Sequence, residues 1–238
     1  MTCHRVESPY GGRRIDRDAD AHAVCRFFDV SRESCERLAT YVSLLERWQS
    51  RINLVSRKTL GMVWARHVAD GLQLLPHIPQ GPVELVDLGS GSGVPGLILA
   101  LTLASRREVS VRLVESHARK AAFLRTVIRE TGIRAMVINS RIEAVDWATV
   151  LPHGVRAIIL ARALAPLPQL LELAWPLLAR GAQALWHKGQ DVEREIADST
   201  RCWQLACEMI PSVTDPRGVI LKIDRARRIK SRQECQAG

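Results

Sequence analysis

Short apolar runs alternate with amphipathic stretches through most of the chain. The runs that predict buried strands are 83–88, 109–115, 134–139, 155–160, 182–186, 203–210 and 218–223. The stretches that predict helices between them are 97–101, 117–131, 166–180 and 192–199. This alternation indicates an α/β fold with a mostly parallel sheet of about seven strands. The connection before the last strand is short enough for a hairpin, so we expect that strand to be antiparallel.

Two amphipathic segments, over residues 31–48 and 59–77, precede this alternation. Apolar residues recur in both at spacings typical of helices that bury one face. Arg66, His67 and Asp70 fall within about one turn of the second segment. They either pack the segment against the α/β domain or face a substrate, and we favour the packing role.

These patterns divide the chain into four parts. Residues 1–20 are polar and predict a flexible arm. We expect an N-terminal helical segment over 21–80 and the α/β domain over 81–224. The dense basic run within 225–238 predicts a disordered tail that adds nonspecific affinity for a polyanion.

A glycine-rich stretch, 86–96, joins the first predicted strand to its helix. Gly89, Gly91 and Gly93 let the backbone turn sharply and lie against a ligand. From Gly91 onward the glycines also satisfy G-x-G-x-x-G, which keeps a dinucleotide in consideration. Asp87 argues against it, because a carboxylate at the strand end would repel a pyrophosphate and suits an ammonium or sulfonium group.

A second carboxylate, Glu115, ends the next predicted strand. A carboxylate at this position can accept hydrogen bonds from both hydroxyls of a ribose. Together with Asp87 and the bare backbone of the loop, it describes a site for S-adenosylmethionine, which carries an amino-acid cation, a sulfonium and a ribose diol.

Further polar residues follow the later strands, where the carboxyl edge of the sheet lies beside the glycine loop. Ile142 can cover an adenine face and Glu143 its polar edge, although Glu143 is equally explained by a helix N-terminus. Arg162 can bind the methionine carboxylate or a substrate phosphate through its planar fork. Lys188 is the last cationic residue of this edge.

Composition narrows the class of protein. The chain has 238 residues and a formal net charge of +9, which favours a polyanionic partner such as nucleic acid. Its six cysteines, at 3, 25, 35, 202, 207 and 235, form no C-x-x-C pair. We therefore expect reduced thiols, no metal site and no disulfide framework. The absence of a signal peptide or a membrane-length apolar run predicts a cytoplasmic protein without membrane contact.

Six short motifs occur in one order along the chain. They are Arg66-His67-Val68-Ala69-Asp70, the loop 89–96, Arg119-Lys120-x-x-Phe123-Leu124, Arg141-Ile142-Glu143, Ala161-Arg162-Ala163 and Lys188-Gly189. This set, over about residues 35–223, resembles the RsmG (GidB) family of bacterial 16S rRNA guanine-N7 methyltransferases. Two positions depart from the family pattern: Ala161 replaces serine and Gly218 replaces histidine, which removes one possible substrate contact.

The resemblance implies a class I, Rossmann-like methyltransferase domain that uses S-adenosylmethionine. Its substrate would be one guanine in the 530-loop region of 16S rRNA, as naked rRNA or in the small ribosomal subunit, and we expect a monomer. The residues that would contact the cofactor by this resemblance are Gly89, Val94, Ile142, Glu143 and Arg162. Asp87, Gly91, Gly93 and Glu115 join them on the strand-end and loop arguments above.

Guanine N7 carries a lone pair and no proton, so its methylation needs no general base. Alignment of donor and acceptor and a suitable electrostatic field would carry the reaction. We therefore assign no acid, base or nucleophile, and Arg162, Lys188 and Arg66 are candidates for contacting RNA phosphates or guanine O6. The alternatives are a methyltransferase for a small molecule or protein, a nicotinamide-dependent oxidoreductase and a noncatalytic RNA-binding module.

Overall fold

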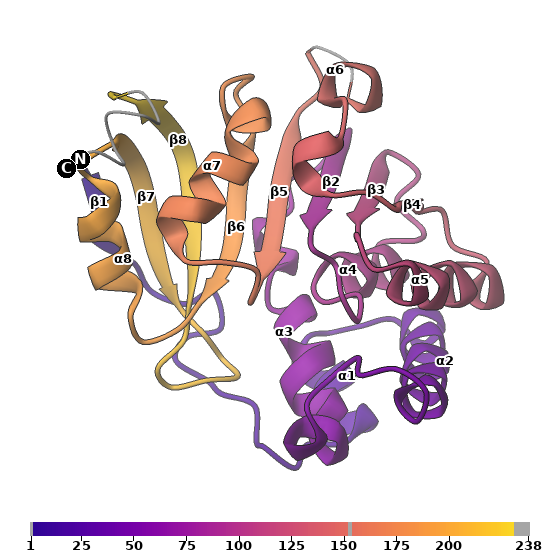
Figure 1. Cartoon of the computed structure of the whole chain (residues 1–238). Coiled ribbons are helices and arrows are strands. Elements are labelled where there is room, and N and C mark those ends of the chain that lie inside the picture. The colour runs from indigo at the N-terminus through magenta and orange to yellow at the C-terminus, as the bar shows by residue number, and fades with distance from the viewer. Residues whose placement is uncertain (1, 152–153, 231–238) are drawn as a thin grey trace.

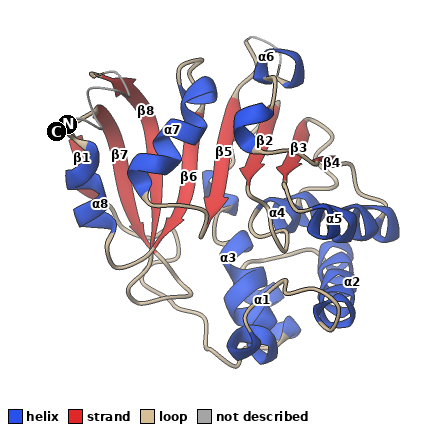
Figure 2. Ribbon diagram, viewed as in Figure 1, coloured by secondary structure: helices blue, strands red, loops and turns tan. Residues whose placement is uncertain are grey.

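The computed structural model describes residues 2–151 and 154–230, and these build one eight-stranded sheet (Figures 1 and 2). In order across the sheet, the strands are β1 (Thr2–Arg5), β7 (Trp203–Pro211), β8 (Val219–Arg228), β6 (Gln183–Lys188), β5 (Ala157–Arg162), β2 (Val83–Leu88), β3 (Val109–Val114) and β4 (Met136–Ile138). Neighbouring strands are parallel except at β8, which is antiparallel to both β6 and β7. The predicted α/β class and the antiparallel last strand are confirmed.

Two hydrophobic cores cover the two faces of this sheet. Along β2, Val83 and Leu85 belong to the first core, whereas Val86 and Leu88 belong to the second. This alternation follows from the period-two geometry of a strand. The helices that contribute to the first core are α1 (Ala21–Phe27), α2 (Arg32–Gln49), α3 (Ala69–Leu72), α4 (Gly96–Thr102) and α5 (Ala118–Thr131). Those of the second core are α6 (Trp147–Val150), α7 (Leu167–Leu178) and α8 (Val192–Ser199).

Local signals set the ends of several helices. The Ser31 side chain accepts a hydrogen bond from the Ser34 amide at 3.3 Å and caps α2, as a serine before an apolar repeat predicts. Gly132 ends α5 in the left-handed conformation, with φ of 65°. Pro166 stands at the N-cap of α7, where its missing amide hydrogen removes no helical bond.

The expected flexible arm over 1–20 is wrong at its start, where β1 adds an eighth strand. β1 pairs in parallel with β7, the Val6 amide donates to the Met209 carbonyl at 3.1 Å, and the Ile15 amide donates to the Val213 carbonyl at 3.0 Å. An edge strand offers unpaired backbone groups to any segment that can reach it. Residues 2–5 have no apolar alternation, so only this distant pairing makes them a strand.

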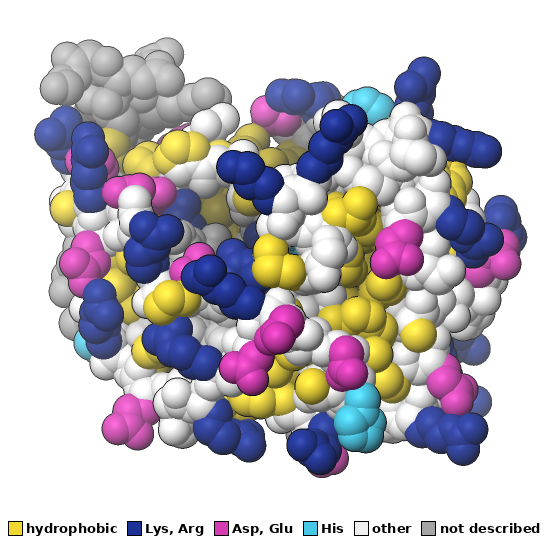
Figure 3. Space-filling view, turned by 90° about the horizontal axis from the view of Figure 1, so that it is seen from below, with side chains coloured by type: hydrophobic (Ala, Val, Ile, Leu, Met, Phe, Trp, Pro, Cys, Tyr) yellow, Lys and Arg dark blue, Asp and Glu magenta, His cyan; other side chains and the backbone are white. Residues whose placement is uncertain are grey.

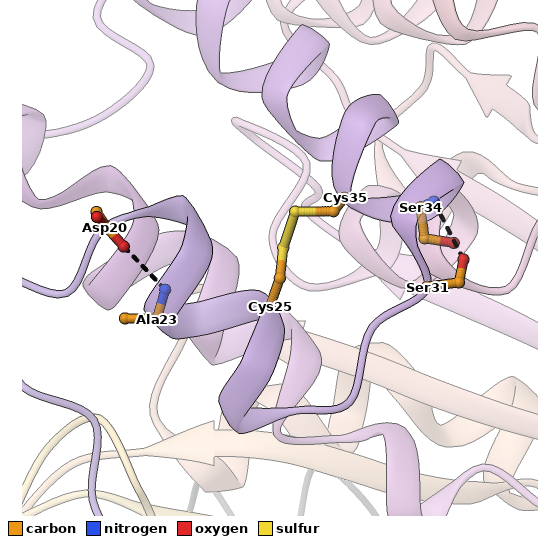
Figure 4. Close-up of a disulfide and its surroundings, with 6 residues drawn as sticks. All are labelled: Asp20, Ala23, Cys25, Ser31, Ser34 and Cys35. Atoms are coloured by element: carbon orange, nitrogen blue, oxygen red, sulfur yellow. Dashed lines mark hydrogen bonds between the residues drawn. A yellow bond between two sulfur atoms is a disulfide. The ribbon is translucent and has the colours of Figure 1, made fainter.

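Two disulfides correct the expectation of reduced thiols. Cys3 of β1 is bonded to Cys207 of β7, and Cys25 of α1 is bonded to Cys35 of α2 (Figure 4). The second bond spans only 10 residues and ties the C-terminal half of α1 to the first turn of α2. The spacing of the cysteines gave no sign of either bond, because each depends on how two separate elements pack.

The basic run at the C-terminus is not wholly a tail, since β8 extends to Arg228. The Arg228 guanidinium lies 4.8 Å from the ring centroid of Trp203 and 5.3 Å from that of Trp175. It also forms an ion pair with Glu172. Pairing with β7 and these aromatic contacts therefore order residues predicted to be loose. Residues 231–238, which include the end of that predicted tail, lie outside the described part of the chain.

The second N-terminal helix, expected over 59–77, is broken into short turns. They are a 3₁₀ turn at Arg57–Met62, a π-helical turn at Trp64–Val68, α3, and a 3₁₀ turn at Leu75–His77. Gly71 lets this segment lie tightly on α4, because a Cβ there would come within 2.5 Å of the Ile98 side chain. π-helical turns are frequent at functional sites, and this one presents Arg66 and His67 to the sheet.

Among the helices of the described residues, none has the length and apolarity needed to cross a bilayer.

Candidate functional site

The carboxyl ends of the parallel strands form one face of the molecule, which Figure 3 views directly. β2 lies between β3 and β5, so the chain leaves β2 at the point where the strand order reverses. Ligands of open α/β sheets bind at such a point. Lysine and arginine side chains are spread over this face, with acidic side chains between them (Figure 3).

The glycine loop turns from β2 into α4 over a buried side chain. Gly89 has φ of 70°, a conformation that side chains rarely adopt. Gly96 has no room for a side chain, because a Cβ there would lie 2.5 Å from the Asp87 Cβ. Loop and strand end thus fit together only if these positions are glycine.

Asp87 lies beneath the loop, with 1% of its surface exposed. Its Oδ2 accepts a hydrogen bond from the Gly96 amide at 3.2 Å, whereas its buried Oδ1 has no partner among the described atoms. Burial raises the pKa of this carboxyl to about 7. Asp87 therefore fastens the loop to the start of α4 in this structure, and contact with a ligand cation stays a prediction.

Glu115 fastens the other side of the same loop. Its Oε2 accepts a hydrogen bond from the Gly91 amide at 2.8 Å, and its Oε1 accepts one from the His117 amide at 2.7 Å. Tyr41, which the sequence did not single out, donates its hydroxyl to the Ser92 carbonyl at 3.0 Å. The loop is thus supported from β3 and from the N-terminal helix α2.

A cavity of about 230 Å³ opens beside this loop, and we refer to it as the donor cavity. It is lined by Gly89, Val114, Ser116, Ser140, Arg141, Ile142, Glu143, Leu164, Ala165, Gln169 and Leu173. Gly89, Ile142 and Glu143 are thus together, as predicted. Asp87, Gly91, Gly93, Val94 and Glu115 are absent from its walls and belong to the loop and its support. Arg162, the remaining predicted cofactor contact, is also absent from these walls. A larger hollow of about 560 Å³ continues from it past Ile142 and Glu143.

A separate cavity of about 260 Å³ brings together the three candidate substrate contacts, and we refer to it as the acceptor cavity. Its walls include Arg66, Asp70, Arg162, Ala163, His187, Lys188, Gly189, Ser212, Thr214, Asp215, Gly218 and Val219. The N-terminal segment, β5, β6 and the β7–β8 connection all contribute. The site is therefore shared between parts of the chain that the sequence treats as separate.

Arg162 is held by the N-terminal segment through three contacts. Its Nε forms an ion pair with Asp70 Oδ2 at 2.8 Å, its Nη1 donates to His67 Nδ1 at 3.0 Å, and its Nη2 donates to the Arg66 carbonyl at 3.2 Å. The side chain is 22% exposed, and that of Asp70 is 9% exposed. The favoured packing role of His67 and Asp70 is therefore combined with fixing the guanidinium at the cavity wall.

Asp70 is also the centre of a buried network that the sequence did not predict. Its Oδ1 accepts hydrogen bonds from Thr214 Oγ1 and, at 3.1 Å, from Gln73 Nε2, and its carbonyl contacts His187 Nε2 at 2.8 Å. The Gln73 Oε1 accepts a bond from the Val213 amide at 3.1 Å. No local pattern marks Thr214 or Gln73, because Thr214 lies 144 residues from Asp70 and Gln73 lies 140 residues from Val213.

His67 is neutral at physiological pH in this setting. Burial, followed by the charge of Arg162, lowers its pKa to about 4. Because a guanidinium only donates, Nδ1 accepts from Arg162 and Nε2 carries the proton that is donated to Thr59 Oγ1 at 3.0 Å.

Arg66 and Lys188 differ in how available their charges are. Arg66 is 26% exposed, donates to the Thr214 carbonyl at 2.6 Å and lies 3.7 Å from an Asp215 oxygen. Lys188 is only 7% exposed and forms an ion pair with Glu195 of α8. The part of the chain that the structure describes holds no cluster of metal-ligating side chains.

Comparison with known proteins identifies relatives along most of the chain. The family model described as rRNA small subunit methyltransferase G matches residues 34–219. A protein of that name from Paramagnetospirillum magneticum is 47% identical over 84% of this chain and 92% of its own length. One from Rhodopseudomonas palustris is 44% identical over 93% of both chains. The fold is similar to the cofactor-bound crystal structure of Rv0187 from MTB, with a TM-score of 0.51 and 13% identity over 80% of this chain and 90% of that one.

Proposed function

The chain belongs to the rRNA small subunit methyltransferase G family, and from that membership we propose that it methylates N7 of one guanine in the 530-loop region of 16S rRNA. S-Adenosylmethionine is the methyl donor. The observation that carries the proposal is the family match over residues 34–219 together with an acceptor cavity walled by Arg66, Arg162 and Lys188. The nicotinamide-dependent oxidoreductase considered from the sequence has no support in this family.

The residues of the donor cavity fit the methyl donor. The cavity combines apolar walls at Ile142 and Leu164 with polar groups at Ser116 and Glu143, as an adenosine requires. The loop beside it keeps a bare backbone at Gly89 and a buried carboxylate oxygen of Asp87 that has no hydrogen-bond partner among the described residues. Ile142 and Glu143 would hold the base, and the loop would hold the amino-acid end.

The donor supplies an electrophilic methyl group on a positively charged sulfur. Guanine N7 would attack this methyl group with its own lone pair while the sulfur–methyl bond breaks and the sulfur leaves as a neutral thioether, so the chain has to orient the base rather than remove a proton from it. Arg162 is positioned to donate to guanine O6 or a phosphate from the cavity wall. Asp70 beside it balances the guanidinium, so a base that becomes positive does not face an uncompensated cation.

The proposal also covers the RNA acceptor, the cellular location and the oligomeric state of the protein. We expect action in the cytoplasm, on 16S rRNA or the small subunit, by a monomer. A net charge of +9 and the lysine and arginine side chains spread over the face in Figure 3 support binding to an RNA backbone.

The decisive experiment is to incubate the pure protein with labelled donor and undermethylated small subunits or naked 16S rRNA, and to map N7-methylguanine. One labelled guanine in the 530-loop region is expected. Label at another position, in protein or in a small molecule only, would overturn the proposal. Arg162→Ala is expected to reduce turnover. Unchanged turnover with unchanged donor affinity would show that Arg162 has no role in the proposed reaction.

A further inference from the structure

The donor and acceptor cavities are separated by one short segment, Ala163–Ala165. Ala163 lines the acceptor cavity, whereas Leu164 and Ala165 line the donor cavity. Ala163 has φ of 51°, which is uncommon for a residue with a side chain. The Leu164 side chain lies so close to Gly89 that a Cβ there would come within 2.6 Å of its Cδ1. Because a methyl group passes only between atoms in contact, the position of this segment decides how donor and acceptor meet.

An ion pair fastens the C-terminal side of the segment. Lys188 Nζ, at the end of β6, donates to the Ala165 carbonyl at 3.2 Å. Glu195 Oε2, on α8, accepts the Leu167 amide at 2.7 Å. The two charged groups also pair with each other. The Leu167 amide belongs to the first turn of α7, where amides have no helical partner.

This geometry does not suit Lys188 as a phosphate contact. Its side chain is 7% exposed, and its ammonium is already bonded to a carboxylate and a carbonyl. Breaking such a pair to reach RNA would leave Glu195 as a poorly compensated charge.

We propose that Lys188 and Glu195 are a positioning pair that holds Ala163–Ala165 between the two cavities, and that neither residue grips the RNA. The proposal rests on the proposed function for its kinetic consequence, but the fastening itself is a property of the chain.

Glu195→Gln and Lys188→Met test the pair, with Glu193→Gln as the matched control. Glu193 is on the same helix, pairs only with exposed Arg5 in the described contacts, and is 64% exposed. With undermethylated small subunits, we expect kcat to fall at least about tenfold in both test variants and KM for the RNA to stay within about twofold. Lys188→Arg is expected to recover part of the kcat lost in Lys188→Met.

The salt dependence of RNA binding separates positioning from phosphate contact. A lost phosphate contact lowers the slope of log K against log salt by about 1, whereas we expect an unchanged slope. A reduced slope with unchanged kcat in Lys188→Met would overturn the proposal, and so would full kcat in Glu195→Gln. If Lys188→Met does not fold, Lys188→Met/Glu195→Leu removes both charges and is expected to show the low kcat with an unchanged slope.

Amide hydrogen exchange tests the hydrogen bond between the Leu167 amide and Glu195 without an activity measurement. Exchange at Leu167 is expected to accelerate at least about tenfold in Glu195→Leu, which removes the acceptor of its amide, and to stay unchanged in Glu193→Leu. Accelerated exchange in Glu195→Leu, together with a wild-type protein that methylates no RNA, would contradict the proposed function and leave the positioning pair standing. Unchanged exchange in Glu195→Leu would overturn the positioning pair.

Discussion

The donor and acceptor sides of this site are built in different ways. On the donor side, backbone amides are held by carboxylates close in sequence: Asp87 binds the amide 9 residues on, and Glu115 one 24 residues back. On the acceptor side, a charged side chain meets a distant polar partner: Arg162 contacts His67 across 95 residues, and Asp70 contacts Thr214 across 144 residues. The glycine loop on the first side is fastened mainly by β2, the start of α4 and Glu115 after β3. The second exists only when the N-terminal segment, β5 and the β7–β8 connection have docked.

The largest effect is expected from a substitution that disrupts only the glycine loop of the donor side. Gly96→Ala would drive a Cβ to within 2.5 Å of the Asp87 Cβ and 2.7 Å of its Oδ2, and the Asp87 side chain is itself buried. We expect a loss of about 3 kcal/mol in the free energy of unfolding, together with loss of measurable donor binding in calorimetry. Gly61→Ala is the control, since nothing lies within 4 Å of a Cβ at Gly61. Equal stability of the two variants would show that the loop is not closely packed on Asp87.

The next effect probes the long-range coupling on the acceptor side. Asp70→Ala leaves Arg162 without its carboxylate in a mostly buried place, so we expect a loss of about 2 kcal/mol. Arg162→Ala should lower the free energy of unfolding far less in the Asp70→Ala variant than in the wild type, because Arg162 and Asp70 share one interaction. Removing the exposed partner Glu36 of Arg32 should change stability by less than about 0.5 kcal/mol. Additive losses in chemical denaturation would contradict the coupling.

The same contrast explains what could be predicted from the sequence. Asp87, the loop glycines and Glu115 stand at strand ends that apolar runs reveal, so their position needs no knowledge of distant contacts. The strand of residues 2–5 has no such pattern and forms because β7 offers it a free edge. Thr214 and Gln73 are ordinary in sequence and become important only beside Asp70.

Lys188 shows most clearly where prediction from the sequence ends. Its place at the end of a strand was predicted correctly, yet its role depends on Glu195, a residue of α8 that the sequence marks only as part of an amphipathic helix. A pattern therefore locates a charge, whereas its partner decides whether that charge is available to a ligand.

The disulfide between α1 and α2 offers a way to weaken the N-terminal segment, which supplies Arg66 and Asp70 to the acceptor side. Removing a cross-link of this loop length is expected to cost about 2 kcal/mol. Cys35→Ser should therefore lower the melting temperature of the oxidised protein, while donor affinity stays unchanged because the glycine loop is elsewhere. Under reducing conditions, which also open the Cys3–Cys207 bond, the wild type and Cys35→Ser should melt at the same temperature. A variant that loses donor affinity would show that the two sides are not independent.

The smallest effect compares the two sides through the pH dependence of stability. Burial raises the pKa of Asp87 on the donor side and lowers the pKa of His67 on the acceptor side. The pKa of Asp87 is raised to about 7 by burial, from an ordinary value of about 4. Between those values the folded protein binds more protons than the unfolded chain, so this group lowers stability as pH rises. The pKa of His67 is lowered to about 4 by burial, from about 6.5. Here the unfolded chain binds more protons, so stability is lost as pH falls.

Asp87→Asn should therefore gain stability relative to the wild type as pH rises from about 4 to 7, with a slope of at most about 1.4 kcal/mol per pH unit. His67→Gln should gain relative to the wild type as pH falls from about 6.5 to 4, with the slope reversed. Denaturation at several pH values measures both differences, and the buried histidines His77 and His187, whose pKa values are also lowered by burial, cancel because every variant retains them. If the stability differences of the two variants changed with pH in the same direction, burial would not shift the pKa values of Asp87 and His67 in opposite directions. The two sides of the site would then not differ in their electrostatics.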